Sequence, residues 1–217
     1  MANPRFSHRK NKQLKKTNLA TSILPLHNEL LWAMIGLLLT IGGTFVPAFF
    51  PNMPWEWSNQ GMQVYPLKVS FQIGAVLLVG CLGGKNAGAW SQIAYLAIGL
   101  SGLSVFSQGG GLEYLSKPSF GYLLGFIPGA WLCGYLAFQN KAYLESLTCS
   151  CFCGLITIHF FGLTYLLGLQ IASPAHRGII TFFQAIWEYS LYPLPGQMAV
   201  MCAVSLLAFF LRRVMFY

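Results

Sequence analysis

Residues 95–138 read YLAIGLSGLSVFSQGGGLEYLSKPSFGYLLGFIPGAWLCGYLAF, and this stretch decides the fold. Two apolar arms, each long enough to cross a membrane as a helix, flank a short polar loop. The loop contains Gly109, Gly110 and Gly111, which have no Cβ to hold the backbone away from a neighbour or a ligand. The pattern predicts two spanning helices whose connecting loop lines a pocket at the membrane face.

The composition of the whole chain supports a membrane location. Of the 217 residues, 55% are hydrophobic and 8% are charged, whereas a soluble domain carries about a quarter charged residues. Because each span needs about 20 residues, the length suits one bundle of about five to seven helices. We therefore predict an integral membrane protein with a single transmembrane domain.

The net charge of +8 is concentrated at the N-terminus, where six of the thirteen basic residues occupy the first sixteen positions. A basic stretch before a first span is typical of a topology signal and of a contact with anionic lipid, so nucleic acid is not the expected partner. The apolar run at 29–50 is too long for the h-region of a signal peptide, and no cleavage site is evident. Residues 1–28 are thus predicted to be a basic cytoplasmic segment, and residues 29–217 the transmembrane domain.

The apolar segments predict an all-α bundle of six transmembrane helices, at residues 30–50, 67–82, 87–106, 120–138, 147–169 and 195–211. Residues 170–190 are amphipathic and predict a helix on the membrane surface. With the N-terminus in the cytoplasm, ten basic residues lie on the inner side and three on the outer side. The positive-inside rule therefore predicts that both termini are cytoplasmic and that the glycine loop faces outward.

Two local patterns leave alternatives open. Gly36 and Thr40 have the spacing of a small-xxx-small motif, which serves either docking onto a partner membrane subunit or packing within this chain. Trp55, Trp57 and Tyr65 lie between the first two predicted spans, where they form either an interfacial aromatic belt or a lid over a pocket.

Catalytic chemistry is not indicated. All five acidic residues are glutamates, and there is no nucleotide-binding P-loop, so ATP-driven work would need another subunit. We expect a binding protein and not an enzyme, with no cofactor and no metal site. Cys149, Cys151 and Cys153 come nearest to a soft-metal site, but three cysteines without a close histidine or carboxylate predict packing.

Polar residues in apolar surroundings predict a small-molecule site. His159 lies deep in a predicted span, where it either hydrogen-bonds a ligand or is satisfied by a backbone carbonyl. Other neutral side chains offer further donors and acceptors to a ligand that is otherwise apolar. The predicted substrate-binding residues are Gln72, Gly109, Gly110, Tyr122, His159 and Gln197.

Several motifs, in order along the chain, resemble those of the biotin transporter family BioY, whose members are substrate-binding membrane subunits of energy-coupling-factor transporters. GLSVF at 102–106 resembles the family's GLPVF, and KPSFGYLLGF at 117–126 resembles PTGGYLLGF, which follows a Gly-rich loop. Gln72 matches the glutamine of PFTLQT, and PLPGQMAV at 193–200 resembles PFLPGDLLK. The resemblance covers about residues 65–212.

This resemblance implies a six-helix S component that captures biotin, or a related small vitamin, from the outer face of the cell membrane. It also implies partners, namely an energy-coupling transmembrane subunit and two ATP-binding subunits. Transport would then proceed without covalent chemistry in this chain.

The chain departs from the family at two positions of the last motif. Gln197 and Val200 stand where family members place an aspartate and a lysine that are implicated in holding biotin. Glutamine can hydrogen-bond a ureido group, but valine cannot pair with a carboxylate, and a charge-assisted bond is stronger than a neutral one. Lys68, Lys117 or Arg177 would have to replace the cation from the loops. The alternative hypothesis is a BioY-like subunit that has lost biotin binding and acts as a structural or assembly subunit of a larger membrane complex, or that binds a different small ligand.

Overall fold

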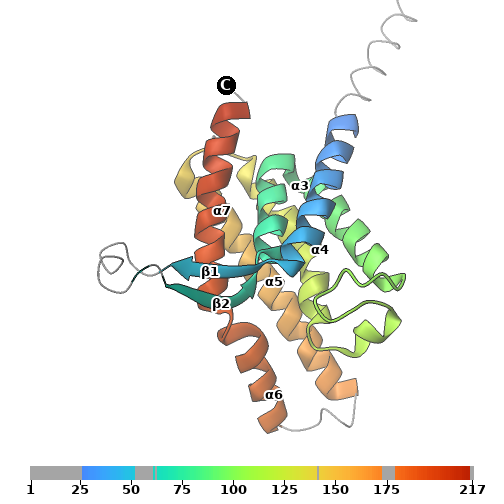
Figure 1. The fold of residues 1–217 in the computed structure, drawn as a ribbon. Helices are drawn as coiled ribbons and strands as arrows, with labels where there is room; N and C mark the ends of the chain where they lie inside the picture. Colours follow the sequence, from blue (N-terminus) through green and yellow to red (C-terminus); the bar gives the residue numbers. More distant parts are fainter. Residues whose placement is uncertain (1–25, 52–60, 62, 141, 173–178, 216–217) are drawn as a thin grey trace, which may run out of the picture.

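The computed structural model describes residues 26–51, 61, 63–140, 142–172 and 179–215 (Figure 1). The described chain is mostly helical, with one short antiparallel pair of strands. Its elements, in order, are the helix Leu26–Phe45, β1 (Pro47–Pro51), β2 (Val64–Ser70), α3 (Gln72–Leu100), the 3-10 helix η2 (Leu112–Ser116), α4 (Phe120–Ala137), α5 (Leu144–Ala172), α6 (Ile179–Ile186), the π-helix η4 (Trp187–Leu191) and α7 (Leu194–Met215).

Five segments of the described chain are long and apolar enough to cross a membrane: Leu26–Phe45, Gln72–Leu100, Phe120–Ala137, Leu144–Ala172 and Phe182–Met215. The predicted helical membrane protein is thus confirmed in its class, but the count of six spans is not. The second and third predicted spans lie largely on α3, which begins at Gln72 and ends at Leu100, short of the predicted end at residue 106. Residues 182–190, predicted to belong to a surface helix, fall within the last candidate span.

The long helix α3 folds back on itself at Gly84. This residue has φ 83° and ψ −178°, a conformation that glycine reaches because it lacks a Cβ. Gln72 Nε2 donates to Tyr95 Oη at 2.9 Å, although a straight helix would hold these residues about 34 Å apart. The segments on either side of Gly84 therefore run antiparallel, as the neighbouring teal and green helices of Figure 1 show.

A β-hairpin corrects two predicted boundaries. The first helix ends at Phe45 instead of continuing to residue 50, and residues 64–70 form a strand where a span was predicted from residue 67. β1 pairs antiparallel with β2, with Pro47 opposite Ser70 and Phe49 opposite Pro66. Proline lacks the N–H that a helix interior needs but is tolerated in a two-stranded pair, in which both strands are edges. Trp55 and Trp57 lie outside the described residues.

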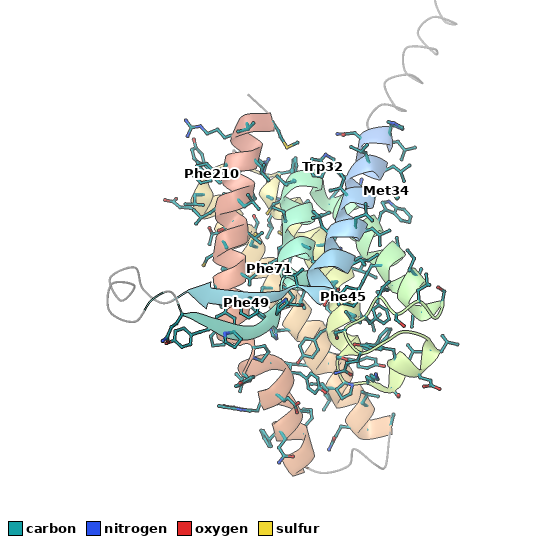
Figure 2. All side chains as sticks on the ribbon, viewed as in Figure 1. Trp32, Met34, Phe45, Phe49, Phe71 and Phe210 are labelled. Atoms are coloured by element: carbon teal, nitrogen blue, oxygen red, sulfur yellow. The ribbon has the colours of Figure 1, made fainter. Side chains whose placement is uncertain are left out.

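The outer surface of the bundle is apolar. Figure 2 shows Met34, Phe45 and Phe210 pointing away from it, and their side chains are 54%, 61% and 62% exposed. A soluble protein rarely exposes so continuous an apolar surface, so these side chains are suited to contact with lipid.

The small-xxx-small motif of the first helix faces inward. A Cβ on Gly36 would lie 2.7 Å from Val79 Cγ1 of α3. Thr40 is fully buried, and its hydroxyl donates to the Gly36 carbonyl at 2.8 Å and accepts from Gln92 Nε2 at 3.1 Å. The structure therefore favours packing within this chain over docking for this motif.

Candidate ligand-binding site

Four buried polar side chains meet between α4, α5, η4 and α7. Tyr122 Oη lies 2.6 Å from Ser190 Oγ, which lies 3.1 Å from His159 Nδ1. His159 Nε2 lies 2.6 Å from Gln197 Oε1. We call these four residues the polar cluster. Each of them is less than a tenth exposed.

The partners of His159 define the direction of these hydrogen bonds. Gln197 presents its amide oxygen, which only accepts, so His159 Nε2 carries the proton and donates. The unprotonated Nδ1 then accepts from the Ser190 hydroxyl, and Ser190 Oγ in turn accepts from Tyr122. The result is one directed chain from Tyr122 to Gln197, in which every link is satisfied at a depth where water is scarce.

Irregular backbone places Ser190 in this chain. It lies in the π-helix η4, where the Tyr192 amide donates to the Trp187 carbonyl five residues earlier at 2.8 Å. A π-turn inserts an extra residue into the helical repeat and commonly occurs at functional sites. The sequence analysis missed Ser190 because a π-turn has no simple sequence pattern. The available signal was a single serine in the aromatic run WEYSLY at 187–192.

Aromatic rings form a wall beside the polar cluster. Tyr122 meets the His159 ring edge-on, with centroids 5.6 Å apart, and Tyr189 stacks on Tyr122 at 6.4 Å. Tyr189 also lines a hollow of about 190 Å³ between α5 and α6, together with Pro118 and other side chains. Stacked rings next to convergent polar groups are typical of small-molecule sites.

Gln72, a fourth predicted site residue, belongs to a different hydrogen-bond network. Its amide nitrogen donates to Tyr95 Oη at 2.9 Å, and Tyr95 donates to the Val105 carbonyl at 3.0 Å. Thr44 of the first helix lies 3.2 Å from the same phenol oxygen. Gln72 therefore ties the first helix, α3 and the loop after α3 together.

Gly109 and Gly110 shape the loop between α3 and α4. Gly109 exchanges two backbone hydrogen bonds with Phe106, at 3.1 and 3.2 Å, and has φ 106°. A Cβ on Gly110 would collide with the Leu103 carbonyl. These contacts make both glycines necessary for the turn itself, and a direct role in ligand binding stays a prediction.

Three basic residues were candidates to replace the family's lysine at position 200. In the described part of the chain, none of them reaches the polar cluster. Lys117 donates to the Gln108 carbonyl at 2.9 Å and lies 4.9 Å from the centroid of the Tyr114 ring, so its ammonium group anchors the glycine loop. The Lys68 side chain and Arg177 lie outside the described structure. Val200 is buried, and a Cβ on Gly74 would lie 2.8 Å from its Cγ1, so this position serves helix packing.

Comparison with known proteins gives consistent matches. An uncharacterized 21.2 kDa protein of Cyanophora paradoxa is 29% identical over 187 residues, which cover 86% of this chain and 95% of that protein. A probable biotin transporter BioY of Lysinibacillus sphaericus is 41% identical over 98 residues, or 45% of this chain and 43% of that protein. The chain thus matches less than half the length of this second relative.

A solved structure shares the fold. It is the crystal structure of the S-component for biotin from an ECF-type ABC transporter, with a TM-score of 0.59 and 19% identity, covering 89% of this chain and 93% of that one. The sequence model of the BioY family matches residues 20–216. Because this match spans nearly the whole sequence, the chain belongs to the BioY family.

Proposed function

We propose that this chain is the substrate-binding subunit of a vitamin uptake transporter and that its ligand is biotin. The observation that carries the proposal is the polar cluster, because it gathers convergent donors and acceptors beside stacked aromatic rings in a BioY-family bundle. Relatives named as biotin transporters support the choice of ligand. The comparisons give no support to the alternative of a structural subunit without a ligand.

The polar cluster has the chemistry to bind the head of biotin. A ureido group offers one carbonyl acceptor and two N–H donors. His159 Nε2–H can donate to the carbonyl, and Gln197 Oε1 can accept from an N–H, so the ligand would replace the bond that these residues now make with each other. The rings of Tyr122 and Tyr189 would cover the apolar bicyclic core.

The four side chains of the polar cluster carry no fixed positive charge. The ring and the ureido head would therefore provide most of the affinity, and the carboxylate tail would contribute less than in a site with a lysine. The chain would bind and release its ligand without covalent chemistry. Transport would depend on an energy-coupling transmembrane subunit with ATP-binding subunits.

We further propose a topology with six crossings and both termini in the cytoplasm. The two antiparallel arms of α3 would cross separately. Lys85, next to the turn at Gly84, and Arg212, near the end of α7, both lie against the C-terminal end of α4, where Lys85 Nζ is 5.5 Å from the centroid of the Tyr135 ring and Arg212 Cζ is 4.3 Å from that of the Phe138 ring. Arg212 Nη1 donates to the Ala137 carbonyl at the end of α4, at 2.6 Å. Clustered basic residues mark the cytoplasmic side.

Calorimetric titration of the full-length protein in detergent with biotin tests this proposal. We expect saturable binding, weakened about 10- to 100-fold in Gln197→Ala, because a buried hydrogen-bond partner is removed. Gln139→Ala, an exposed glutamine near the end of α4, is the matched control and should bind like the native chain. If the native chain does not bind biotin but the Gln197→Asp/Val200→Lys double variant does, the fold is right and the native ligand is a different molecule.

A further inference from the structure

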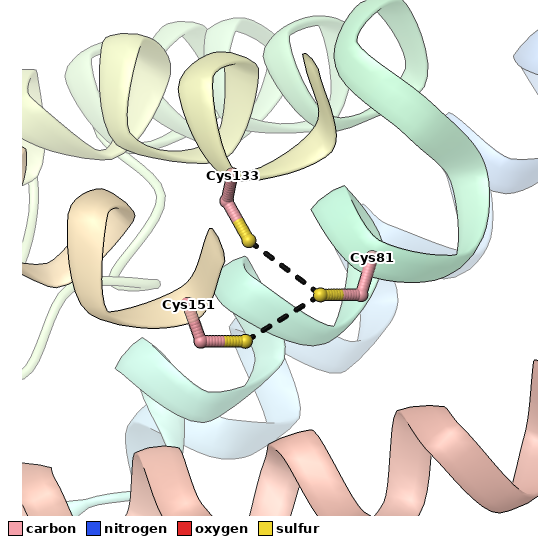
Figure 3. Close-up of side chains that lie close together, drawn as sticks. All are labelled: Cys81, Cys133 and Cys151. Atoms are coloured by element: carbon pink, nitrogen blue, oxygen red, sulfur yellow. Dashed lines mark hydrogen bonds between the residues drawn. The ribbon is translucent and has the colours of Figure 1, made fainter. Parts of the chain in front are cut away.

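Three cysteines from three helices meet in the bundle core. Cys81 of α3, Cys133 of α4 and Cys151 of α5 point toward one another (Figure 3). The sulfur of Cys81 lies 3.6 Å from that of Cys133 and 3.4 Å from that of Cys151. All three sulfurs lie within 4.8 Å of one another, and the three side chains are fully buried. We call them the thiol cluster.

The thiol cluster differs from the cysteine run singled out in the sequence. Of the residues at 149, 151 and 153, only Cys151 contributes, while Cys149 is exposed and Cys153 is partly buried. Along the sequence, Cys81 lies 52 positions before Cys133 and 70 positions before Cys151. Spacing within one segment could not predict this group.

The sulfur positions match a three-coordinate metal site. A disulfide needs sulfurs about 2.05 Å apart, much closer than these. Three thiolates at about 2.3 Å from a shared ion, the usual metal–sulfur distance, would be about 4 Å apart. To reach this arrangement, the two sulfur–sulfur distances from Cys81 would lengthen by about half an ångström. We propose that Cys81, Cys133 and Cys151 bind one Cu(I) ion.

The donor set favours Cu(I) over zinc. Structural zinc sites use four ligands, and among the described histidine, cysteine and acidic residues the three thiols have no fourth member. The Leu77 carbonyl, 3.6 Å from Cys133 Sγ, is a hard oxygen that accepts from this thiol. Soft thiolates without a hard ligand select Cu(I).

A nearby cation offsets part of the charge. Binding through three thiolates releases three protons and leaves a net charge of −2 on the complex. The buried Arg212 guanidinium acts electrostatically on Cys81 and donates to the Ala137 carbonyl, so it is held in place close to the site. Charge pairing of this kind lowers the cost of burying an anionic complex.

A route for the ion leads in from the end of the bundle where Arg212 lies. A hollow of about 450 Å³ there is lined by Glu29, Gly83 and Gly134, among others. Gly83 is two residues from Cys81, and Gly134 follows Cys133 directly. The hollow is thus lined by residues one or two positions from Cys133 and Cys81, and a site that exchanges its ion needs such an entry path.

The test is copper retention by the full-length protein in detergent, kept reduced and free of oxygen. Cu(I) is supplied with bicinchoninate as competitor, and copper per chain is measured after desalting. We expect about one ion per chain, with X-ray absorption showing three sulfur neighbours at about 2.3 Å. In Cys81→Ala the affinity for Cu(I) should fall about 100-fold or more. Mutating a residue that only hydrogen-bonds to a metal ligand already lowers metal affinity about 10- to 100-fold, and Cys81 is itself a ligand.

Matched variants separate this site from the other thiols. Cys149→Ala and Cys202→Ala remove exposed cysteines and should retain copper like the native chain. Cys133→Ala and Cys151→Ala each remove one thiol of the same cluster from α4 and α5. One variant that folds is therefore enough to test the site. If none of the three variants folds, X-ray absorption of the native protein tests the proposal, because it shows whether three sulfurs coordinate the copper. Absence of retained copper, retention that survives loss of Cys81, or preferred binding of zinc with a fourth ligand would each overturn the proposal.

Discussion

The polar cluster and the thiol cluster are both built across α4 and α5, yet they differ in how their helices meet. Tyr122 and Cys133 are eleven residues apart on α4, so the two clusters lie about 16 Å apart in depth. The thiol cluster joins helical segments of α3, α4 and α5 at a tight crossing, and the break in α3 at Gly84 follows three residues after Cys81. The polar cluster uses the π-turn η4 and the start of α7, where the backbone is irregular.

This difference in backbone has a functional meaning. Regular helices that cross at glycines form a close-packed layer, which changes shape only at considerable cost. A π-turn beside two prolines is held by fewer repeating hydrogen bonds and can rearrange more readily. We infer that the polar cluster is the part of the bundle that opens for a ligand, while the layer of the thiol cluster holds the helices in place.

The largest expected effect comes from removing the central member of the polar cluster. His159→Leu leaves Gln197 Oε1 without its donor and Ser190 with Tyr122 as its remaining partner, and an orphaned buried group costs about 1–3 kcal/mol. We therefore expect biotin affinity to fall about 100-fold. Isothermal titration calorimetry measures this directly. The control is Phe160→Leu, the neighbouring residue on α5 that faces outward. Equal affinities in both variants would contradict a role for the polar cluster in binding.

A methyl group added to the tight crossing tests the layer of the thiol cluster. In Gly154→Ala the new Cβ would lie 2.8 Å from Leu77 Cδ2 and 3.0 Å from Cys133 Cβ. Overpacking of this kind costs about 1–3 kcal/mol, so the melting temperature in detergent should drop. Gly168→Ala on the same helix has no atom within 4 Å of its Cβ and should melt like the native chain or slightly higher. Similar melting of the two variants would mean that the crossing is not tightly packed.

A smaller effect is expected at the bridging hydroxyl of η4. Ser190→Ala removes the link between Tyr122 and His159 but leaves the His159–Gln197 bond in place. We expect a loss of about 1 kcal/mol, or about fivefold in biotin affinity, measured by the same titration. Ser101→Ala removes an exposed hydroxyl that donates to the Ile98 carbonyl and serves as the control. An undiminished affinity in Ser190→Ala would place the ligand away from the π-turn.

The smallest effect is expected at the glycine loop. Lys117→Met removes an exposed ammonium group that is already engaged by the Gln108 carbonyl and the Tyr114 ring. Because an exposed charge contributes about 1 kcal/mol at most, biotin affinity should change by less than about fivefold. Biotin and its carboxamide should lose affinity to the same small extent. A much larger loss confined to biotin would show that Lys117 pairs with the carboxylate.

The sequence analysis predicted part of the polar cluster for reasons that are visible in the chain itself. A histidine inside an apolar span needs polar partners, and Tyr122 and Gln197 were among the few candidates. Hydrogen bonds now join His159 to Gln197 directly and to Tyr122 through Ser190. Gln72, which was predicted to bind substrate together with them, donates to Tyr95 in the structure, and its role toward a ligand stays a prediction. The residue type predicts that a buried polar side chain needs a hydrogen-bond partner. Which residue becomes that partner depends on which helices pack against one another.

The membrane class and the family were determined by the sequence alone. A bilayer favours apolar residues at each position of a span, whatever the residue contacts. The membrane location can therefore be predicted from the composition of each segment without knowing the tertiary contacts. The motifs of residues 102–126 are likewise local, since they encode turns and close approaches within a few residues. For the same reason the helical segments were located well, except where Pro47 and Pro66 belong to a hairpin.

Only the tertiary structure decided which distant residues meet. The fold-back at Gly84 brings Gln72 to Tyr95, the π-turn brings Ser190 to His159, and the packing of α3, α4 and α5 brings Cys81, Cys133 and Cys151 together. Each of these contacts joins residues 18 or more positions apart. Their formation depends on helix directions and crossings, which are set by the packing of the whole bundle and not by any single segment.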